Sequence, residues 1–433
     1  MKTTTLFIKR TEGFSTLWIM VAAFMCYTGM YAIRKSFLAG QYLDLGFGFD
    51  LDAKTVLVVS QVLGYMCSKF LGIKIISEMS HQNRAKWLVG LVGFGLLMLL
   101  VFAYVPSTLK AFTLFFNGLP LGMVFGVVFS YLEGRRNTEL LAAALSATFI
   151  FSTGLVKTVG VVLMQNLNVS ENIMPFVTGL LFFPLFLLSV WMLSVSKKPS
   201  EDDIKERSER LPMTKSERKL FLKQHGIGFS GLVVVYILLT IVRDFRDNFI
   251  VEFWNELGYA QMPGLITLTE VPVAVIVLVI AAFGILLRNS HRAFNWGMWL
   301  TAGSGVLILV ISILFKSALV SPVIWVITTG IGVYLPYILF HCLIFERLVA
   351  FLRVKGNVGF LFYTADALGY LGSVFVLLYK EAINYKGSWV RFFEQININA
   401  AIAVFVVSIL TLFYFRAVRI KKEKMLGVSA TLD

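Results

Sequence analysis

The stretch Phe14–Lys35 reads FSTLWIMVAAFMCYTGMYAIRK, and it places Arg34 at the end of an apolar run long enough to cross a bilayer as a helix. Arg243 holds a matching place about two hundred residues later, within Thr240–Asp247 (TIVRDFRD). An arginine inside the membrane costs about 2.5–3.5 kcal/mol on insertion scales, so it is rarely kept without a use. One such arginine in each half of the chain indicates a site for an anion between the two halves.

The composition is that of a membrane protein, since 58% of the 433 residues are hydrophobic and only 15% are charged. Apolar runs of about twenty residues recur along the whole chain, and we interpret the first as a span rather than a cleaved signal peptide. We predict an all-α membrane protein of twelve transmembrane helices, at about 15–35, 54–76, 87–105, 110–132, 140–165, 173–195, 228–250, 264–287, 294–315, 321–345, 357–379 and 395–416.

The formal net charge of +14 is explained by topology. Lys and Arg gather in the loops on the side of the N-terminus and in the tail at 416–424, whereas acids such as Asp44 and Asp52 lie on the opposite side. The positive-inside rule then predicts a multi-pass protein of the cytoplasmic (inner) membrane with both termini in the cytoplasm. The expected partner is the lipid bilayer, and no nucleic acid is expected.

The residues that carry most enzyme chemistry are scattered. Cys26, Cys67 and Cys342 lie in separate apolar runs, and the four histidines are too far apart in sequence for a cluster. No P-loop, dinucleotide fingerprint, nucleophile elbow or zinc motif occurs. We therefore expect no catalytic residue, no metal, no cofactor and no enzymatic activity.

A polar segment divides the chain into two halves. We predict an N-terminal six-helix half at 1–195, a cytoplasmic linker at 196–227, and a C-terminal six-helix half with a basic cytoplasmic tail at 228–433. Duplicated halves joined by a linker are typical of transporters whose substrate site lies near the midplane. Gly118, Gly122 and Gly126 repeat every four residues, which puts them on one helix face for close packing.

Five stretches carry a family resemblance: Tyr31–Phe37 (YAIRKSF), Gly64–Phe70 (GYMCSKF), Leu239–Arg243 (LTIVR), Tyr334–Pro336 with His341, and Gly369–Ser373 (GYLGS). In this order they resemble helices one, two, seven, ten and eleven of the organophosphate:phosphate antiporters of the major facilitator superfamily. Those proteins carry glycerol 3-phosphate or hexose phosphates. The resemblance implies that Arg34 and Arg243 hold a substrate phosphate, that Lys69 adds positive field, and that Glu270 matches a glutamate of helix eight.

Two departures from the family pattern bear on the substrate. Ser152 stands where the family has a histidine, and Asp366 stands where the family tends to have a small residue. The arginines could also be satisfied by carboxylates of the chain itself, namely Asp244, Asp247 or Glu270.

The predicted site has two groups of residues. The substrate-binding group is Arg34, Arg243, Lys69, Tyr31, Tyr65 and His341. The group for ion coupling or charge balance is Glu270, Asp366, Lys157, Asp244 and Asp247. Lys35 follows Arg34 and therefore lies on another helix face, where we expect it to extend toward the interface.

We predict a monomeric secondary transporter that moves a small anionic solute, an organic phosphate in exchange for phosphate, by alternating access. One alternative is a proton-coupled symporter of a carboxylate or zwitterion, driven through Glu270 or Asp366. Another is a non-transporting membrane sensor or accessory subunit, whose intramembrane charges would pair with one another and leave no cavity. A membrane enzyme is a third, and it lacks a recognisable nucleophile or metal set.

Overall fold

The structure is a computed structural model that describes residues 2–47, 51–77, 79, 81–132, 135, 138–196, 215–352, 358–383, 385 and 387–425. Helices and short connections make up this part of the chain, which contains no strand. The prediction of an all-α fold is confirmed.

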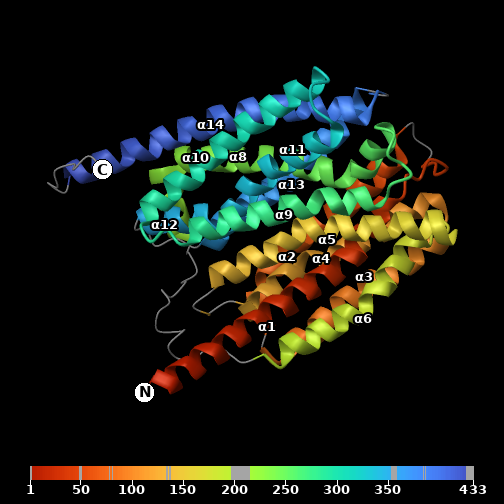
Figure 1. The fold of residues 1–433 in the computed structure, drawn as a ribbon, viewed down its shortest axis with the longest axis horizontal. Coiled ribbons are helices and arrows are strands. Elements are labelled where there is room, and N and C mark those ends of the chain that lie inside the picture. The colour runs from red at the N-terminus through yellow and green to blue at the C-terminus, as the bar shows by residue number, and fades with distance from the viewer. Residues whose placement is uncertain are drawn as a thin grey trace. The chain divides into compact units, whose positions relative to one another are not determined.

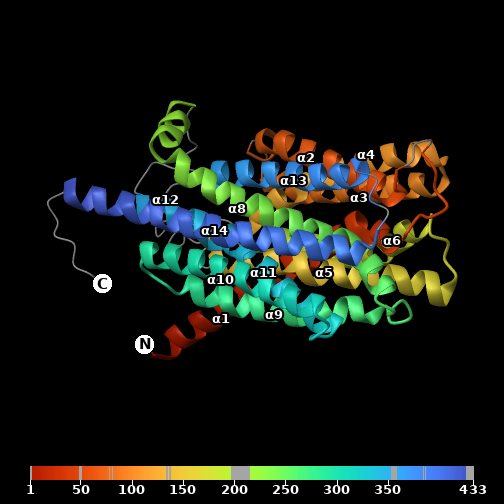
Figure 2. The ribbon, with the colours of Figure 1, turned by 90° about the horizontal axis from the view of Figure 1, so that it is seen from above.

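The helices follow the predicted spans (Figure 1). Every predicted span falls on a helix, although α1 (Lys2–Lys35), α8 (Lys215–Glu256) and α14 (Trp389–Met425) extend beyond the apolar runs. Figure 2 shows α14 as one continuous helix. Eleven spans within the described residues are long and apolar enough to cross a membrane, and the 25-residue α2 is not among them. The elements are α1 (Lys2–Lys35), η1 (Ser36–Ala39), α2 (Ala53–Ser77), η2 (His81–Asn83), α3 (Arg84–Tyr104), α4 (Ser107–Leu132), α5 (Thr138–Leu167), α6 (Met174–Ser194), α8 (Lys215–Glu256), α9 (Gly264–Ile285), α10 (Ser290–Lys316), α11 (Pro322–Leu339), η3 (Phe340–Ile344), α12 (Phe345–Leu352), α13 (Val358–Ala382) and α14 (Trp389–Met425).

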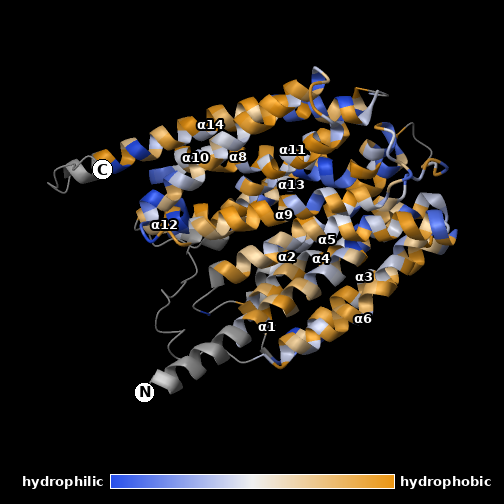
Figure 3. Cartoon of the chain, in the orientation of Figure 1, coloured by the Kyte–Doolittle hydropathy of each residue, from blue (hydrophilic) through white to orange (hydrophobic). Residues whose placement is uncertain are grey.

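Large apolar side chains are exposed along the helices. Phe112, Leu181, Phe283 and Phe413 are each more than half exposed, although a water-soluble protein buries such groups. Figure 3 shows the hydrophobic colour running along the helices, with the hydrophilic colour prominent near many of their ends. This distribution fits helices whose outer faces contact lipid chains.

The chain forms two compact units. The first unit comprises Met1–Glu209, Phe245–Leu278 and Val374–Val390, and the second comprises Arg210–Asp244, Val279–Ser373 and Arg391–Asp433. Residues 197–214 of the predicted linker lie outside the described residues, and α8 begins at Lys215. The division into two six-helix halves stays a prediction.

Within the first unit, glycines allow α2 and α4 to approach closely. A Cβ atom on Gly122 would lie 2.6 Å from the carbonyl oxygen of Tyr65, and one on Gly118 would collide with the carbonyl oxygen of Gln61. A Cβ on Gly64 would collide in the same way with the carbonyl oxygen of Phe115. The expected packing role of Gly118 and Gly122 therefore holds, with α2 as the partner helix.

The close approach of α2 and α4 predicts opposite effects for two glycine substitutions. Gly118→Ala should destabilise the protein by about 1–3 kcal/mol, because its methyl group meets backbone rather than a movable side chain. Gly93→Ala on α3 should be neutral or stabilise by about 0.5–1 kcal/mol, because open space surrounds that position and alanine favours a helix. Thermal unfolding of the detergent-solubilised variants measures both, and equal melting temperatures would contradict the packing argument.

Candidate functional site

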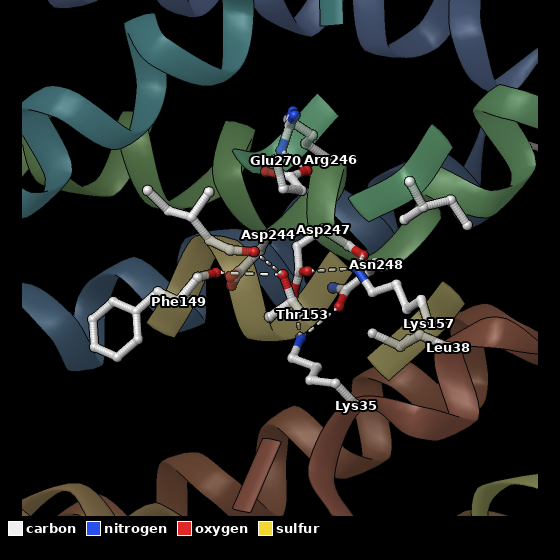
Figure 4. Close-up of polar contacts among 12 residues, drawn as sticks. Lys35, Leu38, Phe149, Thr153, Lys157, Asp244, Arg246, Asp247, Asn248 and Glu270 are labelled. Atoms are coloured by element: carbon white, nitrogen blue, oxygen red, sulfur yellow. Dashed lines mark hydrogen bonds and ion pairs between the residues drawn. The ribbon is translucent and has the colours of Figure 1, made fainter. Parts of the chain in front are cut away.

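Three buried charges meet in the first unit at the carboxyl end of α1. The Nζ of Lys35 lies 2.8 Å from Oδ2 of Asp247, and the Nζ of Lys157 lies 2.6 Å from Oδ1 of the same carboxylate. Lys157 also donates to the backbone carbonyl of Asp247, and Lys35 donates to Oδ1 of Asn248 at 2.9 Å (Figure 4). All three charged residues are at most 7% exposed. We call Lys35, Lys157 and Asp247 the Asp247 clamp.

The local structure explains why the clamp is buried. Lys35 does not end the buried part of the chain, because the short helix Ser36–Ala39 continues from it and is itself fully buried. Phe249 interrupts α8 with non-helical angles (φ −120°, ψ 16°), two residues after Asp247. The expectation that Lys35 extends toward the interface is thus wrong, since it is 4% exposed and paired with a carboxylate.

Two further ion pairs lie near the clamp in the first unit. Arg246 donates to Oε1 of Glu270 at 2.6 Å, and Lys54 pairs with Glu252 while also donating to the carbonyl of Leu38 at 2.8 Å. The second oxygen of Glu270, Oε2, is buried and has no hydrogen-bond partner within the described part of the chain. Glu270 is therefore held by Arg246, and not by either arginine of the predicted site.

Arg34 lies over the ring of Tyr65, also in the first unit. Its guanidinium carbon is 3.5 Å from the ring centroid, and the Nζ of Lys69 is 5.1 Å from the same centroid. The amide of Gln61 donates to the carbonyl of Arg34 at 2.6 Å and to Oδ1 of Asn117 at 2.7 Å. These bonds fix α1 against α2 and α4 at the level of Arg34. The structure thus brings together three of the predicted substrate-binding residues, Arg34, Tyr65 and Lys69.

A group of aromatic rings lies next to Lys69, beyond Tyr65. Lys69 lies 5.7 Å from the ring centroid of Phe125, which packs edge-on against Tyr27. Tyr31 packs against Tyr27 and Phe149 at centroid distances of 5.2 and 6.3 Å. Tyr31 is thus part of an aromatic group next to Lys69.

Arg243 belongs to the second unit, where its partner is the neighbouring Asp244. Its Nη2 lies 2.6 Å from Oδ1 of Asp244, and its guanidinium lies 4.0 Å from the ring centroid of Tyr337. The ring of Tyr370 is 5.6 Å away. As for Arg34, the guanidinium lies over a tyrosine ring, a favourable cation–π arrangement.

Two other predicted residues lie in the second unit near Tyr236. The phenol of Tyr236 donates to Oδ1 of Asp366 at 3.0 Å. The ring of His341 lies 5.9 Å from that of Tyr236, and Nδ1 of His341 donates to the carbonyl of Tyr337 at 2.8 Å. His341 sits in the π-helix Phe340–Ile344, a type of irregularity that often occurs at functional sites.

Buried positive charge exceeds buried negative charge in the first unit. Among its described residues, seven buried cations face three buried carboxylates: Arg34, Lys35, Lys54, Lys110, Lys157, Arg246 and Lys380 against Asp247, Glu252 and Glu270. Part of this charge is compensated within the chain, since Lys380 pairs with the half-buried Glu381 and Lys110 donates to the carbonyl of Phe102.

Sequence reasoning missed Lys54, Arg246 and the role of Lys35 in the clamp. Each lies near the end of an apolar run, where a charge normally reaches the interface, so hydropathy alone gave no sign of burial. Counting all Lys, Arg, Asp and Glu inside the predicted spans, instead of considering single residues, would have indicated that cations outnumber carboxylates there.

The fold is shared with solved transporters of very different sequence. A mutant of the nucleoside transporter NupG matches with a TM-score of 0.61 at 13% identity, over 93% of this chain and all of that one. A D-xylose–proton symporter matches with a TM-score of 0.58 at 15% identity, over 92% of this chain and 97% of that one. At these identities the likeness establishes the fold, which is that of the major facilitator transporters.

Sequence comparison gives a family without an activity. No curated protein matches the chain. One family model, described as a family of unknown function (DUF5690), matches residues 36–418. Because this match covers most of the chain, the protein belongs to the DUF5690 family of unknown function.

Proposed function

We propose that the protein is a secondary transporter that moves a small anionic solute across the membrane by alternating access. The observation that carries this proposal is the pair of cations, Arg34 and Lys69, on the ring of Tyr65 in a unit with excess buried positive charge. An anion would offset that charge. The likeness in fold to solved transporters supports transport as the activity.

An organic phosphate is the solute that fits these donors best. The Arg34 guanidinium lies over the ring of Tyr65, and the paired N–H donors of an arginine suit a phosphate better than a single donor does. Lys69 adds a point charge on the same ring. The resemblance in sequence gives Arg243 the same role, and it favours exchange for inorganic phosphate as the mode of transport.

Ligand binding to purified protein tests this proposal. Glycerol 3-phosphate, a hexose phosphate and inorganic phosphate should each raise the melting temperature of the wild type, with about 2.7 kcal/mol of stabilisation at a hundred times Kd. Arg34→Lys keeps the charge but loses the paired donors, so it should weaken this effect at least tenfold in Kd, and Arg243→Lys should behave alike. Arg288→Lys, at an exposed position, is the matched control.

Transport itself is then measured in proteoliposomes. Liposomes loaded with phosphate should take up labelled phosphate or organic phosphate, and empty liposomes should not. If no anion stabilises the wild type and no anion is exchanged, the non-transporting sensor or accessory subunit becomes the better interpretation.

The Asp247 clamp supplies a closed gate for alternating access. It joins α1 and α5 of the first predicted half to α8 of the second predicted half, all within the first compact unit. Thr158 of α5 adds hydrogen bonds to the carbonyl of Pro263 and to Thr267, at 3.0 and 2.7 Å. A transporter that opens at this end must separate these contacts. An arriving anion that binds the two lysines would weaken their hold on Asp247.

Removing the carboxylate should open the gate. Asp247→Asn leaves two buried lysines without their shared counter-charge, which costs about 3–5 kcal/mol of clamp stability. A cysteine at Thr158, in a protein lacking its native cysteines, should then react faster with a maleimide. The exposed Asp44→Asn should leave the labelling rate unchanged.

A second change separates gating from misfolding. Adding Lys157→Gln to Asp247→Asn removes one of the two uncompensated lysines, so the double variant should be more stable than Asp247→Asn alone. Identical labelling in the wild type and Asp247→Asn would show that the clamp does not hold this end closed.

Proton-coupled symport of a carboxylate or zwitterion is the second candidate. Two buried carboxyl groups favour it. Asp366 accepts a hydrogen bond from the phenol of Tyr236, and Oε2 of Glu270 has no hydrogen-bond partner in the described part of the chain. Either could carry a proton in one state of the cycle.

The two candidates differ in their response to pH. Under symport, uptake should increase as the outside pH falls, and Asp366→Asn or Glu270→Gln should abolish that dependence while binding persists. Under exchange, neither carboxyl variant should change the pH profile. Uptake into pH-clamped proteoliposomes, with Asp44→Asn as the control carboxyl variant, decides between them.

A further inference from the structure

A groove on the surface of the first unit has apolar walls and one basic end. It encloses about 560 Å³ among α2, α3 and α4. Its walls include Leu71, Trp87, Gly90, Phe94, Leu119 and Pro120, and its polar lining comes from Asn83 and Lys86. None of these residues belongs to the proposed solute site.

The groove is open because no side chain fills the space beside Gly90 and its apolar wall residues are partly exposed. Gly90 has open space where a side chain would begin, and Pro120 lies inside α4 without a backbone N–H. Leu71, Trp87 and Phe94 are 54%, 41% and 42% exposed. In a helix of a membrane-spanning fold, exposed apolar walls of this kind are covered by hydrocarbon.

The basic end lies at the start of α3. Asn83 precedes the helix, and its exposed side chain makes no capping hydrogen bond, so its amide can donate to an anion. Lys86 is exposed on the first turn, and Trp87 has the amphipathic side chain that is typical of the membrane interface. This end therefore combines a positive charge with hydrogen-bond donors at headgroup depth.

The length of the groove matches one leaflet. From Lys86 to Phe94 the helix advances eight residues, or roughly 12 Å at 1.5 Å per residue. Half of a hydrocarbon core of about 30 Å is roughly 15 Å. With its polar end at the interface, a groove of this length reaches nearly to the middle of the bilayer.

We propose that this groove binds one anionic glycerophospholipid, with an acyl chain along Gly90, Phe94 and Pro120 and the phosphate at Lys86 and Asn83. A phosphodiester headgroup matches the lysine and the amide donors, and the hydrocarbon chain matches the walls. The site lies in the leaflet on the side of the N-terminus, which the distribution of Lys and Arg predicts to be cytoplasmic.

Lipid binding to delipidated protein tests the proposal. Native mass spectrometry with added phosphatidylglycerol should give one tightly bound lipid per chain, and phosphatidylcholine, which carries no net charge, should bind at least fivefold more weakly. Lys86→Gln should weaken phosphatidylglycerol about fivefold, the effect of one cation near the membrane surface. The same change should weaken phosphatidylcholine less, because the choline ammonium of that lipid offsets the charge of its phosphate.

A pair of glycine variants on α3 isolates the acyl-chain part of the site. Gly90→Leu fills the groove and should abolish the bound lipid, whereas Gly93→Leu, also in open space but outside the groove lining, should bind as the wild type does. Melting temperatures without lipid confirm that both variants fold. Equal binding of the two lipids by the wild type, or unchanged binding by Gly90→Leu, would overturn the proposal.

Discussion

The arrangement of the first unit depends on the cost of holding charge away from water. Asp247 is shared by two lysines that come from different helices, and each of these groups would be expensive to bury alone. The shared carboxylate therefore fixes α1, α5 and α8 in one register. The Lys54–Glu252 and Arg246–Glu270 pairs follow the same logic and join further helices to this point.

The two compact units handle their buried charges differently. The first holds more buried cations than carboxylates, whereas the second pairs Arg243 with Asp244 and holds Asp366 by a phenol. An anionic ligand suits the first arrangement, and a proton suits the carboxyl group of the second. Both proposed functions use residues of both units, since Glu270 lies in the first unit and Arg243 lies in the second, so variants of single residues are needed to separate them.

Hydropathy made the fold predictable, because a helix that crosses hydrocarbon needs about twenty apolar residues whatever its partners are. The helix ends were less predictable. The first turns of α8, from Lys215, are polar, so the sequence predicts a linker there, because polarity alone does not distinguish a surface helix from a loop.

The site was predictable only in part. Arg34, Tyr65 and Lys69 could be grouped because the two stretches that contain them, on α1 and α2, both carry the family resemblance. The partners of Asp247 could not, because Lys157 lies 90 residues away in sequence and Lys35 lay at the expected end of a span. Pairing across such separations is decided by tertiary packing, which a single sequence does not encode in any short pattern.

The glycine contacts between α2 and α4 have a consequence for the energetics of binding. Backbone touches backbone there, and Gln61 and Asn117 tie the carbonyl of Arg34 to the same two helices. The backbone of Arg34 is therefore held on a rigid support before the proposed solute binds. A preorganised site loses little conformational entropy on binding, so more of the interaction energy of an anion remains as affinity.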